Sequence, residues 1–373
     1  WTFSPVLCLA RDLRWGRVGE TFGEDPWLIG RFAGAMVRGY QGDNLSDRDS
    51  VLACAKHYAG YSETQGGRDA TEADISRRKL RSYFLPPFEK AVRAGVATFM
   101  TGYQSMEGRP STGNSWLLRT VLKEEWGFEG FLVTDWNTVG SLVTGQKICA
   151  DAVDAAALAI RCGNDMIMST PGFYRGGIEA VRQGKVDEDL VDEAVRRILT
   201  LKFRLGLFEN PRRPTGKDPR IGCEEHRTVA LQAARESIVL LQNRGRLLPL
   251  SAEKTGRVAV IGPNADDPFA QLGDWTLGTG QAGWGTHPRE ATVTVLDGLR
   301  QVFADVVYQP GCKLPPPGEE DSGDVLIAPA VETARRADVV VLVVGDNRYY
   351  CGEHRSTATL ELPGQDRKST RLN

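Results

Sequence analysis

The sequence lacks a long apolar run and an excess of charge of either sign. Its longest apolar stretches, such as residues 339–344, fall far short of the roughly 20 residues that a membrane-spanning helix needs. Lys and Arg number 46 against 48 Asp and Glu, which gives a formal net charge of −2. We therefore expect neither a membrane protein nor a partner of nucleic acid.

The sequence also lacks a cysteine motif. Its seven cysteines are scattered, odd in number and without a CxxC pair, so neither a zinc cluster nor a disulfide scaffold is expected. We predict free, mostly buried thiols, which favour the cytoplasm over the periplasm or secretion. We expect no metal and no cofactor. The cysteines are Cys8, Cys54, Cys149, Cys162, Cys223, Cys312 and Cys351.

Both ends of the chain are unusual. It begins with Trp1 rather than Met, and residues 366–373, DRKSTRLN, resemble the translation of a common sequencing-library adapter. We interpret the sequence as truncated at both ends and residues 366–373 as an adapter artefact, to be left out of the fold.

Five short apolar runs predict β-strands. They are rich in Val, Ile, Leu and Phe without polar alternation, as in parallel strands that are covered on both faces. The runs are residues 3–10, 51–58, 96–100, 131–135 and 165–169.

Helical segments separate these runs. Asp25 followed by Pro26 predicts a helix start, with Phe32, Met36 and Tyr40 on one stripe. Repeated strand-then-helix units indicate a parallel α/β fold.

Polar and aromatic side chains follow several of the predicted strands. RDLRWGR, with Arg17, follows the first, Lys56 and His57 end the second, Tyr103 follows the third, and Asp135 with Trp136 ends the fourth. In a (β/α) barrel these strand ends form one rim that carries the active site. A doubly wound sheet would instead concentrate its chemistry at one crevice.

The chain divides into two α/β domains. We predict a catalytic (β/α)8 TIM-like barrel at residues 1–207 that lacks its N-terminal strands. A linker rich in Pro, Gly and charge follows at 208–225. Residues 226–365 then form a second, truncated α/β sandwich domain, with strand-like runs at RVAVIG and ADVVVLVVG.

Taken alone, each polar residue has a structural reading beside a chemical one. Asp135 could be a helix N-cap or a catalytic carboxylate, with Trp136 as a flat face for a sugar ring. Lys56 and His57 should point to opposite faces unless the strand kinks. The two residues could be a surface Lys and a core His, or they could donate hydrogen bonds to substrate hydroxyls. Lys56 alone could instead be a Schiff-base lysine. Arg17 and Arg68 are loop arginines, which are usually solvated.

The motifs together resemble a known family. FSPVLCLARDLRWGRVGETFGEDP, AKHYAGYSETQGGRDA, MTGYQSMEGRPSTGN, GFEGFLVTDW and KFRLGLFENP occur in the order of the signature blocks of glycoside hydrolase family 3. AARESIVLLQNRGRLLPL, VAVIGPNAD and GEHRSTATLELPG continue the likeness into a second domain. The bacterial β-glucosidase and β-xylosidase branch is the most similar.

The resemblance implies a retaining exo-β-glycosidase that releases terminal β-linked glucose or xylose through a glycosyl-aspartate intermediate. Its substrate would be an oligosaccharide or an aryl or alkyl β-glycoside. Asp135 matches the nucleophile and Glu353 the acid/base. The positions that match the sugar-binding residues are Arg17, Lys56, His57, Arg68, Tyr103 and Trp136.

The proposed roles carry electrostatic expectations. We expect Arg17, Arg68 and Lys56 to keep Asp135 ionised, and a dry environment to raise the pKa of Glu353.

Other readings stay open. A Schiff-base lyase would use Lys56 and need no carboxylate from the second domain. A non-catalytic carbohydrate-binding relative is the third possibility. The β-N-acetylhexosaminidase branch of the family is disfavoured, because KHYAGYSETQGG lacks the second His of that branch's loop.

Overall fold

The computed structural model describes residues 1–212, 216, 218–276, 289, 292–316, 319 and 326–364. The adapter-like residues 366–373 lie outside the described residues, as do four positions of the predicted linker.

The first unit is built on parallel strands in sequence order. β1 (Cys54–Tyr58), β3 (Thr98–Thr101) and β6 (Phe131–Val133) pair in the order β1-β3-β6, all parallel. Single parallel bridges extend the array on both sides, from Val6 to Lys56 and from Val133 to Met166. The five predicted strands therefore lie side by side, although the first and last are reduced to bridges. This is the succession of a (β/α) barrel.

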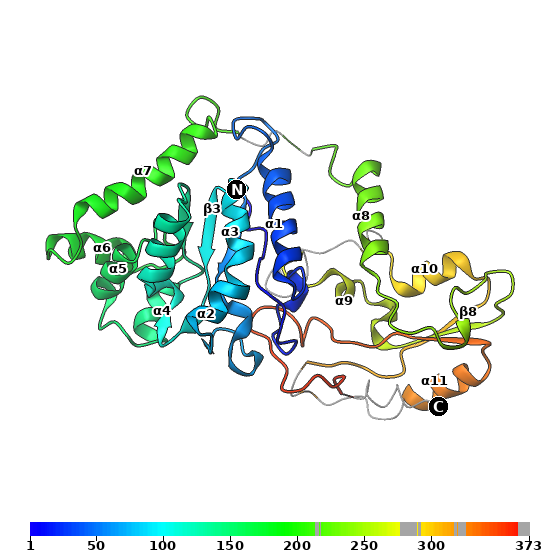
Figure 1. Cartoon of the computed structure of the whole chain (residues 1–373). Helices are drawn as coiled ribbons and strands as arrows, with labels where there is room; N and C mark the ends of the chain where they lie inside the picture. Colours follow the sequence, from blue (N-terminus) through cyan, green and yellow to red (C-terminus); the bar gives the residue numbers. More distant parts are fainter. Residues whose placement is uncertain are drawn as a thin grey trace.

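Helices and turns connect and cover these strands (Figure 1). The helices are α1 (Pro26–Gln41), α2 (Arg77–Lys79), α3 (Pro86–Arg93), α4 (Thr138–Thr144), α5 (Ala152–Arg161), α6 (Phe173–Arg182) and α7 (Glu188–Arg204), with wider π-type turns at η4 (Leu80–Phe84) and η6 (Trp116–Glu125). Short 3-10 turns are η1 (Val18–Glu20), η2 (Tyr61–Glu63), η3 (Gln65–Gly67) and η5 (Ser111–Gly113). A small second sheet joins β2 (Glu72–Ala73), β4 (Ser105–Met106) and β5 (Arg109–Pro110).

Helix α1 begins as predicted. Asp25 Oδ1 accepts hydrogen bonds from the amides of Trp27 and Leu28, which is an N-cap. The stripe through Phe32 is not the buried face of the helix, because Phe32 is exposed and Ile29, Ala33 and Val37 are buried. The small residues Gly30, Ala33 and Gly34 on the buried face allow α1 to pack closely against α3.

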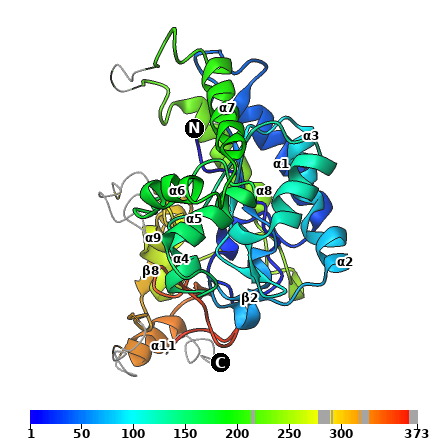
Figure 2. The same cartoon turned by 90° about the vertical axis from the view of Figure 1, so that its left-hand side faces the viewer.

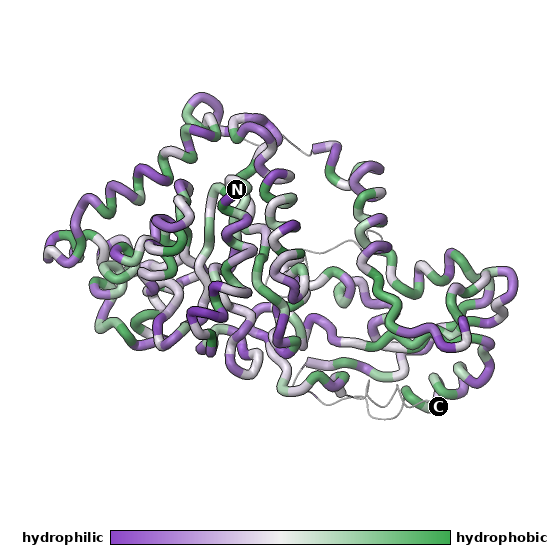
Figure 3. Tube along the Cα trace, in the orientation of Figure 1, coloured by the Kyte–Doolittle hydropathy of each residue, from purple (hydrophilic) through white to green (hydrophobic). Residues whose placement is uncertain are grey.

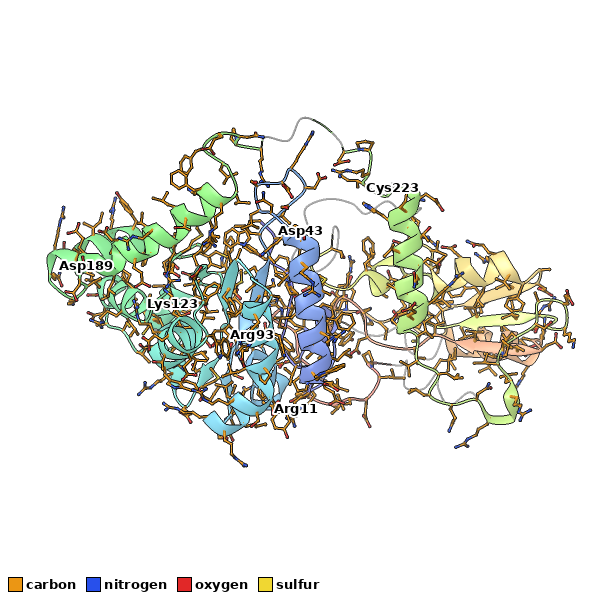
Figure 4. The ribbon with its side chains drawn as sticks, turned by 45° about the horizontal axis from the view of Figure 1, so that its top comes forward. Arg11, Asp43, Arg93, Lys123, Asp189 and Cys223 are labelled. Atoms are coloured by element: carbon orange, nitrogen blue, oxygen red, sulfur yellow. The ribbon has the colours of Figure 1, made fainter. Side chains whose placement is uncertain are left out.

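A buried ion pair ties η6 to the strand array. Lys123, labelled in Figure 4, places Nζ 2.7 Å from Asp165 Oδ1, and both side chains are almost fully buried. Asp165 Oδ2 accepts from the amide of Leu132 in β6. The pair therefore anchors the helix to the sheet that carries the strand ends.

The second unit is a smaller α/β layer (Figure 1), which lies behind the first unit in the view of Figure 2. β7 (Val258–Ile261) lies between β8 (Val306–Gln309) and β9 (Val339–Leu342), with both neighbours parallel to it. β7 is fully buried, and its surroundings form a hydrophobic stretch in Figure 3. The helical segments of this unit are α8 (Glu224–Ser237), α9 (Pro268–Leu272), α10 (Val295–Val302), α11 (Ile327–Arg335), η7 (Arg244–Arg246) and η8 (Pro263–Asp266).

After β9 the chain returns to the first unit. The Gly352 amide donates to Gly16 O, Gly16 N donates to Arg355 O, and Thr357 N donates to Arg14 O. We call residues 352–357 the return segment. In Figure 1 its red-orange trace runs beneath the first unit. The predicted α/β class, a (β/α) barrel unit followed by a second α/β unit, is confirmed.

The remaining surface and thiol features are simple. Within the described part of the chain, no helix is both long and apolar enough to cross a membrane. All seven cysteines are free thiols, and Cys8, Cys54, Cys162 and Cys312 are buried.

Candidate active site

Asp135 lies just beyond the end of β6 and is 7% exposed. Its Oδ1 accepts the amide of Trp136 at 2.7 Å, which fixes the carboxylate at the strand end. Its Oδ2 lies 3.5 Å from His57 Nε2 and has no hydrogen-bond partner among the described residues. One buried oxygen is thus held in place without being saturated.

His57 and Lys56 come from β1, where the pairing with β3 becomes irregular between Ala55 and Tyr58. Adjacent residues of a regular strand point to opposite faces. An irregular strand is therefore what the sequence predicts if Lys56 and His57 both serve one site. His57 is buried, and burial, followed by the charges of Arg17 and Lys56, places the pKa of its imidazole well below the ordinary value. The ring is therefore neutral beside Asp135.

Arg17 is a buried cation between two carboxylates. Its Nε and Nη2 donate to Glu20 at 2.7 and 2.9 Å, and its Nη1 lies 3.2 Å from Glu353 Oε1. The guanidinium also lies 5.6 Å from the ring centre of Tyr61. Such a fixed guanidinium orients the Glu353 carboxyl as well as compensating its charge.

Glu353 lies in the return segment and is 5% exposed. Its amide donates to Asp274 Oδ2 at 2.8 Å. Burial is the main cause that raises the pKa of Glu353, opposed by the charge of Arg17 and supported by that of Asp135. The direction agrees with the expectation for a group that must begin protonated.

Tyr103 connects the two carboxyls. It follows β3 and is half-buried, and burial, then the charges of Asp135 and Glu353, raises the pKa of its hydroxyl. The charges of Asp135 and Glu353 thus both act on the Tyr103 hydroxyl, the charge of Asp135 also acts on Glu353, and Arg17 acts on both carboxyls. The two carboxyls, one from each unit, therefore both lie near the Tyr103 hydroxyl.

The electrostatics of Asp135 differ from the expectation. Burial outweighs the opposing amide of Trp136 and the charges of Arg17 and Lys56, so the pKa of Asp135 is raised. Arg17 and Lys56 act in the expected direction. Arg68 does not act among the principal causes: its side chain is exposed, and the structure gives that side chain no hydrogen bond or ion pair within the described residues.

Trp136 is 64% exposed at the rim, next to the buried Asp135. An accessible indole beside a buried carboxylate leaves a flat apolar face open to a ligand.

Sequence reasoning missed several residues that build the site. Glu20 follows Arg17 by three residues, which is a helical spacing that could have suggested the ion pair. Asp69 and Asp274 accept the amides of His354 and Glu353, and Asp69 also accepts Trp15 Nε1. No local pattern predicts these contacts, because the partners lie far apart in the chain.

Over the part of the chain that the structure describes, no three His, Cys, Asp or Glu side chains form a cluster that could hold a metal ion.

Comparison with known protein families matches both units. Residues 1–201 match the glycosyl hydrolase family 3 N terminal domain, and residues 238–371 match the glycosyl hydrolase family 3 C-terminal domain. The chain is 38% identical to a beta-xylosidase of Formosa agariphila, over 97% of this chain and 51% of that protein. It is 34% identical to a periplasmic beta-glucosidase of Salmonella typhimurium, over 98% of this chain and 50% of that protein.

Comparison with solved structures also finds β-glucosidases. The chain superposes with a TM-score of 0.92 and 51% identity on a β-glucosidase of saponin metabolism from intestinal bacteria, over 100% of this chain and 52% of that one. The glucose complex of a β-glucosidase from Listeria innocua matches with a TM-score of 0.88 and 35% identity, over 100% and 49%. The chain spans about half the length of the relatives it matches.

Proposed function

Because the chain belongs to glycosyl hydrolase family 3, we propose that it carries the site of a retaining exo-β-glycosidase. The proposed substrate is an oligosaccharide or an aryl or alkyl β-glycoside with a terminal glucose or xylose. The observation that carries the proposal is the pair of buried carboxyls, Asp135 and Glu353, which share Arg17 and Tyr103 as neighbours. The names of the relatives, beta-xylosidase and beta-glucosidase, support both sugars.

In the first step, Asp135 attacks the anomeric carbon and forms an ester bond to the sugar. The bond between that carbon and the glycosidic oxygen breaks, and Glu353 donates its proton to the departing oxygen. The unsaturated Oδ2 of Asp135 is the oxygen that we assign to the attack. Because Oδ1 accepts the Trp136 amide, the carboxylate cannot turn freely away from the sugar.

In the second step, the ionised Glu353 takes a proton from water. The resulting hydroxide attacks the anomeric carbon, the ester bond breaks, and Asp135 leaves as a carboxylate. Two inversions give net retention. Burial favours the protonated form of Glu353 at the start of the cycle, while Arg17 favours the ionised form that the second step needs.

The remaining predicted residues would bind the sugar. His57, neutral and 3.5 Å from Asp135, and Lys56 would donate to sugar hydroxyls. Tyr103 would do so from the neighbouring strand end, after β3, and the exposed Trp136 would face the ring or the leaving group. Arg68 would need to move its exposed side chain to take part.

The test measures the stereochemistry of hydrolysis with protein produced from its complete gene. Proton NMR should detect the β-anomer of glucose or xylose as the first product from aryl β-glycosides. We expect Asp135→Asn to reduce kcat by at least about a thousandfold, because it removes the nucleophile. The exposed Asp43 (Figure 4) gives a matched control, and Asp43→Asn should retain full activity.

The same protein distinguishes the other readings. Initial release of the α-anomer would contradict a retaining mechanism. Trapping of a carbonyl substrate on Lys56 by borohydride would favour the Schiff-base lyase. Binding of a glycoside without turnover would favour the non-catalytic relative.

A further inference from the structure

Asp69 is a buried carboxylate that the proposed chemistry does not use. It follows the exposed Arg68 in the loop after η3, yet only 3% of its side chain is exposed. Its Oδ1 accepts Trp15 Nε1 at 2.9 Å, and its Oδ2 accepts the amide of His354 at 2.8 Å. Both oxygens are therefore engaged by donors from two distant parts of the chain.

The two donors lie next to two residues of the proposed site in the chain. Trp15 is buried two residues before Arg17, which contacts Glu353. His354 directly follows Glu353 in the return segment. Asp69 is thus hydrogen-bonded to residues that lie close in the chain to Arg17 and to Glu353, and these two side chains contact each other.

The backbone conformation of the return segment has to be stabilised by hydrogen bonds of this kind. His354 has a φ of +62°, a left-handed conformation that is unfavourable for a residue with a Cβ atom and that is kept only where surrounding contacts fix it. The amide of Glu353 is bonded to Asp274 and that of His354 to Asp69. Two carboxylates, one from each unit, therefore fix two successive peptide groups at the proposed acid/base.

From these contacts we infer that Asp69 is a positioning residue, which holds Glu353 in the orientation for proton transfer by accepting the His354 amide and Trp15 Nε1. The inference rests on the proposed function, since it assigns Asp69 to the acid/base half of that mechanism. Its negative charge also contributes to the raised pKa of Glu353.

The substitution Asp69→Asn tests the role with little change of shape. An amide has one acceptor oxygen, so it can accept from either Trp15 Nε1 or the His354 amide and presents an NH2 group to the other. The matched control is Glu72→Gln, a carboxylate on β2 that accepts the amide of Gly108 away from Glu353. Both variants are made in the protein expressed from its complete gene.

The readout is the dependence on the leaving group. We expect Asp69→Asn to lower kcat/KM for an alkyl β-glycoside, which needs a proton from Glu353, by roughly tenfold, because a buried charge-assisted hydrogen bond is lost. For a 2,4-dinitrophenyl glycoside, whose leaving group departs without a proton, kcat/KM should stay within about twofold. The control Glu72→Gln should leave both values unchanged.

Combination with Glu353→Gln sharpens the test. If Asp69 acts through Glu353, then Asp69→Asn should cause no further loss for the alkyl glycoside in the Glu353→Gln background. An equal loss for both substrates, or full additivity with Glu353→Gln, would overturn the inference. An inactive wild-type protein would instead count against the proposed function.

Hydrogen exchange gives a reading that does not depend on activity. Either the His354 amide or Trp15 Nε1–H should lose protection in Asp69→Asn, because one Asn oxygen cannot accept both, while the Gly352 amide, which is bonded to Gly16 O, should keep its protection. Unchanged protection of both the His354 amide and Trp15 Nε1–H would contradict the inference even if the variant were less stable.

Discussion

Burial dominates the protonation of the individual side chains at this site. It raises the pKa of both Asp135 and Glu353 and lowers that of His57, although cations lie near all three. The consequence is a neutral His and two carboxyls that bind their protons more tightly than in water. Arg17 is the main charge that opposes this effect at Glu353.

Replacement of Glu353 by Gln tests its role as acid. We expect kcat/KM for alkyl glycosides to fall about 10²- to 10⁴-fold, the usual contribution of general acid catalysis. Dinitrophenyl glycosides should react nearly as fast as in the wild type in the first step, and azide should accelerate the second. An equal loss for both classes of substrate would contradict the assignment.

The pH dependence of kcat/KM follows from the raised pKa of Glu353. The first step needs protonated Glu353, so kcat/KM should fall as pH rises through its pKa, which lies above the ordinary value of about 4.3. This basic limb should vanish in Glu353→Gln.

The stability of the fold should depend on the same group, because the folded state binds the proton of Glu353 more tightly than the unfolded state does. Its contribution to the free energy of unfolding is therefore present below about pH 4.3 and lost as pH rises through the folded pKa.

Sequence reasoning at the residue scale reaches the side chains that lie at strand ends. Asp135, Lys56 and His57 could be predicted because the carboxyl ends of parallel strands meet at one rim. Arg68, which the sequence predicts to act on Asp135, is exposed, whereas the side chain of its neighbour Asp69 is buried. Which of two adjacent loop residues turns inward depends on contacts with residues 15 and 354, and no local pattern encodes these contacts.

At the scale of elements, the existence of strands is easier to predict than their length. Residues 3–10 and 165–169 are apolar but form only single bridges, at Val6 and Met166, because each lies at the margin of the described array. The buried face of α1 runs through Ala33 rather than through its larger neighbour Phe32, since Ala33 and Gly34 allow a closer approach to α3 than Phe32 would. Packing between elements, rather than the hydrophobicity of the helix itself, decides that face.

The Lys123–Asp165 pair offers a test of how the elements are held. We expect Lys123→Met to lower the free energy of unfolding of the first unit by about 3 kcal/mol, because it leaves a buried carboxylate without its partner. Urea unfolding followed by tryptophan fluorescence measures the change. Lys185 and Asp154 are the same distance apart, 2.7 Å, but exposed, so Lys185→Met should have little effect. Equal destabilisation by both substitutions would contradict this account.

At the scale of the whole molecule, the proposed site depends on contact between the two units. The sequence predicts two α/β units and a carboxyl from each, but not how the return segment reaches the barrel. That contact depends on close backbone approach. A Cβ atom on Gly16 would lie 2.4 Å from Gly352 O and 2.6 Å from Arg355 O.

We therefore expect Gly16→Ala to push the return segment away from the barrel and to reduce kcat/KM by about tenfold or more, because small misplacements of catalytic groups are costly. Steady-state kinetics with an alkyl glycoside measures the loss. A Cβ atom on Gly19 would meet none of the described residues within 4 Å. Gly19→Ala is therefore the matched control and should leave kcat/KM nearly unchanged. Wild-type activity in Gly16→Ala would show that Glu353 reaches the site without this contact.

The central claim, that Asp135 is the nucleophile of a retaining glycosidase, is tested most directly by covalent labelling. A 2-deoxy-2-fluoro glycoside with a good leaving group slows the second step and should leave one sugar on the protein expressed from its complete gene. We predict that peptide mass spectrometry locates this sugar on Asp135 and that Asp135→Asn takes up none. A label on another carboxylate, or active protein that takes up no label, would contradict the account.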